Sequence, residues 1–455
     1  MPGRLTKGLC LQVFAGSSAS LGAFAAATLF GWVTPILPHL LGPDSEIRMS
    51  PQEASWMIST PEFANMITPI PSGLLIDRFG RKPLLLISAP LFTLGWAIIL
   101  CWRTYSSLLV ARTIQGAAVG IVFTAVPVYL GEIASLENRG AITSLFFLFS
   151  WSGYLFEYCT GPFMSFTNFT YLTLATTVVY FLLMLVQPES PYFCLMKGNE
   201  TAAYRSLRWF RTGSEDSICQ ELDEIKRSVE EDKMKKTNWG EVVATQTDRK
   251  ALFLMLFAGS LRILCGIMPT TSYATRNFMT TDVAIAPKYI TMVLGFVLVL
   301  GAIVSFFTID ILGRRPLIIC SSFGASVCLF IAGVYYYLQS NTEVDVSAYS
   351  WVAPAATLVY AGIVVAGMCP VHTAYTSELF NSNTRANASS IAAVLSTFFT
   401  LVTLKSYQNF IDWFGVYFNY LLFSVICFFG ALISFFVMPE TKNKSFEQIR
   451  DDLKK

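Results

Sequence analysis

Charge is the property that this sequence has least of. Only 14% of its 455 residues are Asp, Glu, Lys or Arg, whereas a soluble domain usually carries about a quarter. The formal net charge is +2, which gives no indication of a nucleic-acid partner. The chain has two His, and its ten Cys include no CxxC pair, so the sequence predicts no metal site. It also holds no nucleophile motif and no phosphate-binding loop, and we expect neither an enzyme nor a bound cofactor.

Apolar residues take the place of the missing charges. They make up 54% of the chain, and the mean hydropathy is +0.53. A helix needs about 20 mostly apolar residues to cross a bilayer, and about a dozen runs meet that length. No cleavable signal peptide is evident, so we expect the first run to be a retained span. The expected spans cover residues 12–38, 54–76, 83–102, 107–130, 141–162, 171–187, 251–274, 287–309, 316–338, 351–373, 386–408 and 417–438.

The segment between the sixth and seventh runs has a different composition. Residues 188–250 are rich in Lys, Arg, Asp and Glu. Short amphipathic helices or a flexible linker would each fit this pattern. We expect an all-α membrane protein of twelve transmembrane helices in two pseudo-symmetric six-helix bundles. Its parts are an N-terminal bundle at 1–187, a cytoplasmic helical linker at 188–250, a C-terminal bundle at 251–438 and a cytoplasmic tail at 439–455.

The positions of the basic residues predict how the chain is oriented. Basic residues follow the even-numbered runs, and loops rich in Lys and Arg stay in the cytoplasm. Both termini are therefore expected inside the cell, with the plasma membrane as the expected location. The opposite side carries the sequon Asn168-Phe169-Thr170, which predicts glycosylation of Asn168 in an external loop.

The same charged motifs occur once in each half of the chain. Asp77 and Arg81 recur 233 positions later as Asp310 and Arg314. A Glu followed seven positions later by an Arg recurs at an offset of 246, and a Pro-Glu pair recurs at an offset of 251. Three pairs in the same order indicate duplication, and parallel halves of six helices are typical of transporters. The expected gating charges are Asp77, Arg78, Arg81, Glu132, Arg139, Glu189, Asp310, Arg314, Arg315, Glu378, Arg385 and Glu440.

These motifs place opposite charges at helix ends, where helix bundles meet. Carboxylates and guanidiniums there would pair when the inner side closes and separate when it opens. Arg suits this role because its planar fork can bind a carboxylate at two points. Each partly solvated pair would contribute about 1 kcal/mol, which is small enough for both faces to open. Topology alone would account for the Arg residues but not for the matched acids.

The motif set resembles that of the sugar porter family of the major facilitator superfamily. The resemblance extends over nearly the whole chain, and within the family the chain looks like the insect facilitators of trehalose and hexose. It implies movement of a sugar by alternating access, either facilitated or coupled to protons. It rests on the segments Gly73–Lys82, Arg112–Gly140, Pro188–Pro191, Asp310–Pro316, Glu378–Arg385 and Pro439–Ser445.

The chain departs from the family at the positions that bind sugar. A fifth-helix Gln is replaced by Phe147, and the seventh-helix Gln-Gln-x-x-Gly-x-Asn reads Arg262 to Met268. Sugar hydroxyls lose affinity quickly when their amide partners are missing. An aromatic survives as Tyr273, and Ser396 stands near an eleventh-helix Asn. The expected substrate cavity comprises Phe147, Arg262, Ile263, Gly266, Met268, Tyr273, Thr373 and Ser396.

Three charges are expected at membrane depth, where ionisable residues are functional candidates. Arg262 could contact a ligand, pair with Glu157 or Glu62, or extend to the membrane surface. Glu157 could make a structural hydrogen bond or couple protons, and His372 could pack or bind a proton. Proton symporters of the family carry an acid in the first helix, and the aligned segment 31–34 holds none. This favours facilitated diffusion.

The sequence thus favours a transporter of a sugar such as trehalose or a hexose. Two alternatives remain: a transporter of a non-sugar solute, which includes anionic solutes, and a non-transporting sensor or inactive paralogue. The expected partners are a small-molecule solute and the lipid bilayer, with no nucleic acid and no obligate protein partner.

Overall fold

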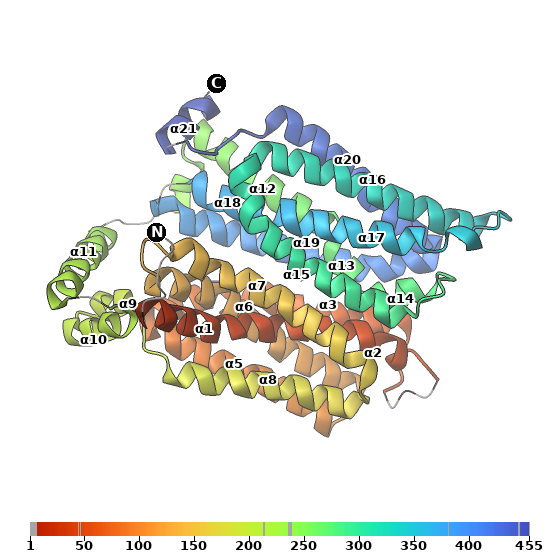
Figure 1. Cartoon of the computed structure of the whole chain (residues 1–455), viewed down its shortest axis with the longest axis horizontal. Coiled ribbons are helices and arrows are strands. Elements are labelled where there is room, and N and C mark those ends of the chain that lie inside the picture. The colour runs from red at the N-terminus through yellow and green to blue at the C-terminus, as the bar shows by residue number, and fades with distance from the viewer. Residues whose placement is uncertain are drawn as a thin grey trace. The chain divides into compact units, whose positions relative to one another are not determined.

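The computed structural model of the chain describes residues 7–43, 45, 47–212, 214–234, 239–380, 382–444 and 446–454. Within these ranges a few side chains are not described, those of Asp310 and Arg385 among them. The described residues form helices and no strand (Figure 1). This is expected for a chain in lipid, where a helix satisfies its own backbone hydrogen bonds.

The N-terminal part of the chain forms eleven of the α-helices shown in Figure 1, within the described residues. They are α1 (Lys7–Gly31), α2 (Val33–Leu40), α3 (Pro51–Ile67), α4 (Pro69–Phe79), α5 (Arg81–Cys101), α6 (Tyr105–Ile133), α7 (Arg139–Thr160), α8 (Phe166–Val186), α9 (Pro191–Met196), α10 (Glu200–Phe210) and α11 (Glu215–Met234), with a short 3₁₀ turn η1 (Gly161–Phe163).

The rest of the chain forms another ten α-helices within the described residues. They are α12 (Gln246–Leu264), α13 (Ile267–Ser272), α14 (Ala274–Met279), α15 (Pro287–Leu312), α16 (Arg314–Asn341), α17 (Val352–Ile363), α18 (Cys369–Glu378), α19 (Ser382–Phe414), α20 (Val416–Val437) and α21 (Phe446–Lys454), with the turns η2 (Trp239–Val243), η3 (Ser347–Tyr349) and the π-helical turn η4 (Val364–Met368).

Ten helical stretches among the described residues are long and apolar enough to cross a membrane. Two further expected spans form helices but fall outside this group, namely α3 with α4 and α7. Both contain acidic residues, Glu53, Glu62 and Asp77 in the first case and Glu157 in the second. These two stretches are thus less apolar or shorter than the ten membrane-length helices.

Contacts divide the chain into two compact units. Unit 1 holds residues 1–29, 64–153 and 167–236, and unit 2 holds 30–63, 154–166 and 237–455. Helices α1, α3 and α7 each pass from one unit into the other. This division differs from a simple cut at the central segment, and the domain boundaries expected from the sequence stay a prediction.

The close packing of α1 in unit 1 depends on small side chains. Ala15, Ala19 and Ala23 repeat every fourth residue and are fully buried. A Cβ added at Gly22 would lie 2.9 Å from the hydroxyl oxygen of Tyr180. Small residues at this spacing let helix backbones approach closely in a membrane.

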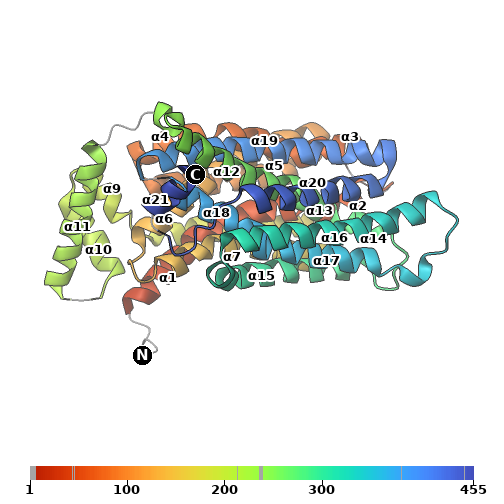
Figure 2. The ribbon, with the colours of Figure 1, turned by 90° about the horizontal axis from the view of Figure 1, so that it is seen from above.

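The central segment forms helices α9, α10 and α11 in unit 1. Leu195, Ala203 and Val229 form a small apolar core among the three. Asn199 caps α10 by accepting a hydrogen bond from the backbone N–H of Ala202 at 3.0 Å. Figure 2 shows these helices grouped beyond one end of α1 and α6. The segment is therefore helical rather than an extended linker.

Two expected spans of unit 2 are interrupted. Gly266 separates α12 from α13 with a left-handed backbone at φ +88°. The turn η4 precedes Pro370, which has no N–H to give to the carbonyl of Ala366. The Thr308 hydroxyl donates to that carbonyl at 3.1 Å. Such interruptions are found where transporter helices line a cavity.

We expect the substitution Gly266→Ala to destabilise the protein. A Cβ at this position would overlap the ring of Phe423, and a left-handed backbone costs a non-glycine residue about 1–2 kcal/mol. The melting temperature in detergent should fall clearly. Gly140→Ala is the control, because a Cβ there meets nothing within 4 Å. An equal melting temperature for both variants would contradict this account of the break.

Candidate functional site

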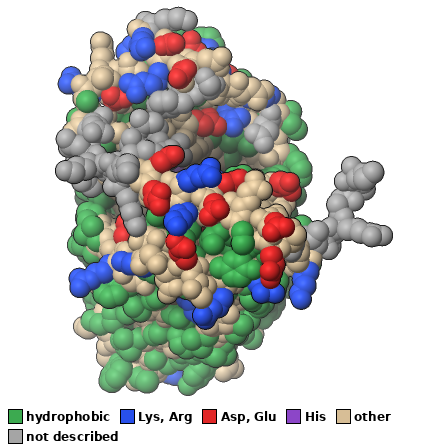
Figure 3. Space-filling view, turned by 90° about the vertical axis from the view of Figure 1, so that its left-hand side faces the viewer, with side chains coloured by type: hydrophobic (Ala, Val, Ile, Leu, Met, Phe, Trp, Pro, Cys, Tyr) green, Lys and Arg blue, Asp and Glu red, His purple; other side chains and the backbone are tan. Residues whose placement is uncertain are grey.

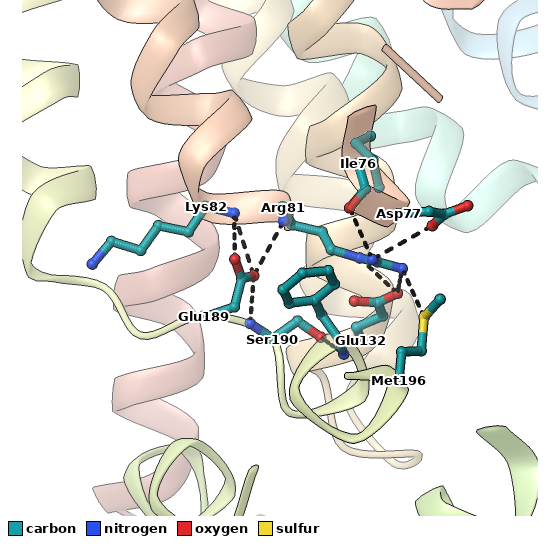
Figure 4. Close-up of polar contacts among 9 residues, drawn as sticks. Ile76, Asp77, Arg81, Lys82, Glu132, Glu189, Ser190 and Met196 are labelled. Atoms are coloured by element: carbon teal, nitrogen blue, oxygen red, sulfur yellow. Dashed lines mark hydrogen bonds and ion pairs between the residues drawn. The ribbon is translucent and has the colours of Figure 1, made fainter. Parts of the chain in front are cut away.

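The charged motif of unit 1 assembles around Arg81, the first residue of α5 (Figure 4). Its Nη2 and Nε donate to the same oxygen, Glu132 Oε1, at 2.7 and 3.1 Å. Its Nη1 donates to the carbonyl of Ile76 at 3.3 Å and lies 3.6 Å from Asp77. Arg81 thus ties the end of α4 to the last turn of α6.

Glu189 completes this network from the segment after α8. Its carboxylate accepts hydrogen bonds from the backbone N–H groups of Arg81, Lys82 and Ser190 at 2.8–3.3 Å. The N–H groups of Arg81 and Lys82 are orphan donors at the start of α5, where a negative charge is favoured. A Cβ at Gly80 would overlap the carboxylate, so the glycine at φ +107° permits this approach.

Unit 2 contains the same network. Arg314 donates through Nη2 and Nε to Glu378 Oε1 at 2.7 and 3.1 Å, and through Nη1 to the carbonyl of Ile309 at 3.1 Å. Glu440 accepts from the backbone N–H groups of Arg314 and Arg315, both at 3.1 Å. The duplication read in the sequence therefore extends to individual hydrogen bonds.

A tyrosine in each half belongs to the network and was not among the expected site residues. Tyr129 donates to the carbonyl of Pro188 at 2.8 Å, and Tyr375 donates to the carbonyl of Pro439 at 2.9 Å. Both stand three positions before the motif Glu. That repeated spacing was the signal that could have identified them.

The two networks differ in burial. The side chains of Arg81 and Glu132 are 4% and 14% exposed, whereas those of Arg314 and Glu378 are 13% and 25% exposed. In unit 1 the helix α9 adds cover, since the Phe193 ring lies 5.3 Å from the Arg81 guanidinium. The expectation of partly solvated pairs is therefore wrong for Arg81, which is buried.

Glu189 at the start of α5 and Glu440 at the start of α16 also differ in the direction in which their pKa is shifted. Burial raises the pKa of Glu189, and the backbone N–H donors and Arg81 only partly offset it. Burial acts the same way on Glu440, but its backbone N–H donors outweigh it and lower the pKa. As the pH falls, we expect Glu189 to take up a proton before Glu440.

The remaining expected gating charges lie at the surface or outside the described side chains. Asp77, Arg78 and Arg139 are exposed, and Figure 3 shows acidic and basic side chains mixed on the face that it displays. Arg315 donates to the carbonyl of Phe435 at 2.7 Å. The side chains of Asp310 and Arg385 lie outside the described part of the structure.

Each Arg–Glu pair described above lies within a single unit. The sequence interpretation placed such pairs where bundles meet. The structure instead shows Arg81 paired with Glu132 inside unit 1 and Arg314 paired with Glu378 inside unit 2. The networks hold the helix ends of their own unit together.

Several of the expected cavity residues have structural roles. Gly266 provides the helix break, and Ile263 is buried at 2% exposure. Tyr273 is buried with its ring 4.8 Å from that of Tyr407. Met268 is half-buried, with its sulfur 4.0 Å from the Tyr154 hydroxyl.

The other cavity candidates of unit 2 lie on three helices that converge at Gly259. A Cβ at Gly259 on α12 would lie 3.1 Å from His372 Nδ1 on α18 and 3.4 Å from Ser396 Oγ on α19. Arg262 lies one turn further along α12 and is half-buried. Thr373 follows His372, and its hydroxyl donates to the carbonyl of Pro370 at 2.8 Å. Phe147 belongs to unit 1, on α7, and is 40% exposed.

The two intramembrane acids are both buried in unit 2. Glu157 is fully buried on α7 and packs against Gly31, where a Cβ would lie 3.1 Å from Glu157 Cβ. Glu62 is 5% exposed and interacts electrostatically with Tyr154. Neither acid forms an ion pair with Arg262 among the described residues.

A second polar network joins α3 to α19 in unit 2. Lys405 Nζ donates to Ser55 Oγ at 2.7 Å and lies 4.5 Å from the centre of the Trp56 ring. Gln408 Nε2 donates to Asp412 Oδ1 at 2.6 Å. The network therefore connects residues more than three hundred positions apart, at the start of α3 and near the end of α19.

Comparison with known proteins shows which family the chain belongs to. A family model described as "Sugar (and other) transporter" matches residues 14–453. The chain belongs to this family. The facilitated trehalose transporter Tret1 of Bombyx mori is 30% identical over 97% of this chain and 86% of that protein. The protein of the same name from Drosophila willistoni is 28% identical over 96% of this chain, which spans about half (50%) of its length.

Solved structures establish the fold of this sugar transporter family member. The inward open xylose transporter XylE from E. coli superposes with a TM-score of 0.76 at 19% identity, covering 98% of this chain and 99% of that one. The proton:xylose symporter XylE bound to 6-bromo-6-deoxy-D-glucose gives a TM-score of 0.74 at 19% identity, with the same coverage. The predicted major facilitator fold and the resemblance to sugar porters are confirmed. The chain is a multi-pass membrane transporter and not an enzyme.

The sequon of this transporter lies in a different setting from the one expected. Asn168 is exposed, but it is the third residue of α8 rather than part of a loop. A span begins at Phe166, so the acceptor stands at the start of a membrane helix. Glycosylation of Asn168 stays a prediction.

We expect Arg81→Gln to cost more stability than Arg314→Gln. The first change leaves the carboxylate of Glu132 buried without its counter-charge, which costs about 3–5 kcal/mol. Glu378 is more exposed and also accepts from the Thr441 hydroxyl at 2.6 Å. Thermal unfolding of the purified protein in detergent measures both. As a control, adding Glu132→Gln to Arg81→Gln should recover part of the loss. A larger loss for Arg314→Gln would argue against the burial argument.

Proposed function

We propose that the chain moves a small polar solute down its gradient by alternating access, with a carbohydrate as the favoured cargo. The observation that carries this proposal is the charged network present once in each unit, with matching atoms and distances. Relatives named as facilitated trehalose transporters support a sugar such as trehalose or a hexose.

The networks suit a protein that must change conformation repeatedly. Each one fixes the ends of its own helices through a guanidinium and two carboxylates. Exposed charges such as Asp77 and Arg139 remain at the same helix ends. Their pairing strength near water is about 1 kcal/mol or less, so contacts that they make can form and break readily. The network of Lys405 would hold α3 against α19 in one of the alternating states.

Facilitated diffusion rather than proton coupling is supported by the first membrane span. Residues 31–34 hold no acid, and the Thr34 hydroxyl donates to the carbonyl of Thr271 at 2.9 Å. Glu157 packs against Gly31 at full burial. A buried acid held in this way fits a structural role, which was one of the two interpretations of Glu157.

The proposal also covers the membrane in which the protein lies and the side on which its termini lie. The basic residues at the even-numbered helix ends support cytoplasmic termini. The plasma membrane is the proposed location, because a carrier of external carbohydrate acts there. We also propose that the expected gating charges and cavity residues act in transport. Glycosylation of Asn168 is proposed because the expected orientation places this residue outside the cell.

Reconstituted protein in liposomes tests the transport proposal. We expect downhill uptake of at least one radiolabelled carbohydrate among trehalose, glucose and glucuronate. The uptake should be the same with and without a pH gradient, because no first-span acid carries a proton. Liposomes without protein are the control. Absence of flux for every hexose, disaccharide and hexuronate would refute transport of a carbohydrate, and acceleration by a proton gradient would refute uncoupled diffusion.

A further inference from the structure

Arg262 is a positive charge well inside a membrane span. The span runs from Gln246 to Ser272, so Arg262 lies sixteen residues after its start and ten before its end. At about 1.5 Å per residue, each end is about 15 Å away or more. Helical side chains lean toward the N-terminal end of their helix, which here is the more distant end. The side chain therefore does not reach the nearer membrane surface.

No acidic side chain neutralises Arg262 among the described residues. Its polar neighbours include the thiols of Cys265 and Cys369 and the imidazole of His372, and none of them supplies a negative charge beside an arginine. Its Nε is buried without a hydrogen-bond acceptor. An intramembrane guanidinium normally pairs with an acid or faces a cavity. Arg262 is half-buried, so its side chain is not fully enclosed by the protein.

A second unsatisfied polar atom lies on the neighbouring helix. His372 Nδ1 is buried and has no hydrogen-bond partner within the described part of the chain. It packs against Gly259, where an added Cβ would lie 3.1 Å from this nitrogen and 3.4 Å from Ser396 Oγ. The helices α12, α18 and α19 thus bring a guanidinium, an imidazole and a hydroxyl to one place in unit 2. An anionic group beside hydroxyls would match these donors.

We propose that Arg262, with His372 and Ser396, forms a subsite for the carboxylate of a small polyhydroxy acid, so that the favoured cargo is an anionic carbohydrate. The carboxylate accepts from the guanidinium fork, and the imidazole and the serine hydroxyl bond to the flanking hydroxyl groups. The inference rests on the proposed transport function and specifies its substrate class. It also gives a reason for a charge that the helix would otherwise have to bury without a partner.

Uptake of glucuronate, glucose 6-phosphate and glucose by reconstituted protein tests the subsite. We expect glucuronate flux to exceed glucose flux at least about tenfold, the effect of one good charge-assisted contact. An inside-positive potential should accelerate glucuronate uptake, because the cargo carries a negative charge. In Arg262→Gln the preference for glucuronate over glucose should disappear. Arg249→Gln removes the same charge from the first turn of the same helix and should behave as the wild type.

Ligand-induced stabilisation separates this inference from the transport proposal. The melting temperature of the purified wild type should rise with glucuronate and not with glucose, and the rise should be lost in Arg262→Gln but kept in Arg249→Gln. This result without any flux would support the subsite and refute transport. Equal preference in wild type and Arg262→Gln would overturn the subsite, as would faster flux of glucose than of glucuronate. A preference for glucose 6-phosphate would overturn the assignment of a carboxylate.

Discussion

The structure depends on one interaction made twice: a guanidinium that donates two hydrogen bonds to a single carboxylate oxygen at the end of a helix. Arg81 makes it with Glu132, and Arg314 makes it with Glu378. In lipid a helix satisfies its backbone internally, so its ends are the places where polar groups remain to be paired. Each network pairs polar groups at helix ends and thereby fixes three chain segments in its own unit.

The place where α12, α18 and α19 converge in unit 2 is the opposite case, because polar groups there are left unpaired. Arg262 and His372 each hold a buried nitrogen without a hydrogen-bond partner among the described residues, whereas the guanidiniums of Arg81 and Arg314 are hydrogen-bonded through all three nitrogens. Unsatisfied buried groups cost stability and are retained where a ligand or a function requires them. The paired helix ends and the unpaired nitrogens of Arg262 and His372 thus follow from the same rule, applied at two places in unit 2.

Much of the architecture could be predicted from the sequence, because apolar runs and repeated charges are properties of single segments. The roles of Tyr129 and Tyr375 could not be read from composition, since each acts through a hydroxyl on a distant carbonyl. The breaks at Gly266 and η4 were missed because hydropathy averages over a whole span. The burial of Glu157 against Gly31 is a contact between distant segments, and a single sequence carries no direct signal for it.

The central claim is that the two networks set the balance between conformations of a transporter. Spin labels at the exposed positions Leu136 and Ser377, in a cysteine-depleted background, measure that balance as a distance distribution by double electron–electron resonance. The account predicts two distance populations whose ratio changes at least about fivefold in Arg81→Gln and in Arg314→Gln, which corresponds to about 1 kcal/mol. A single population, or a ratio unchanged in folded variants, would contradict it.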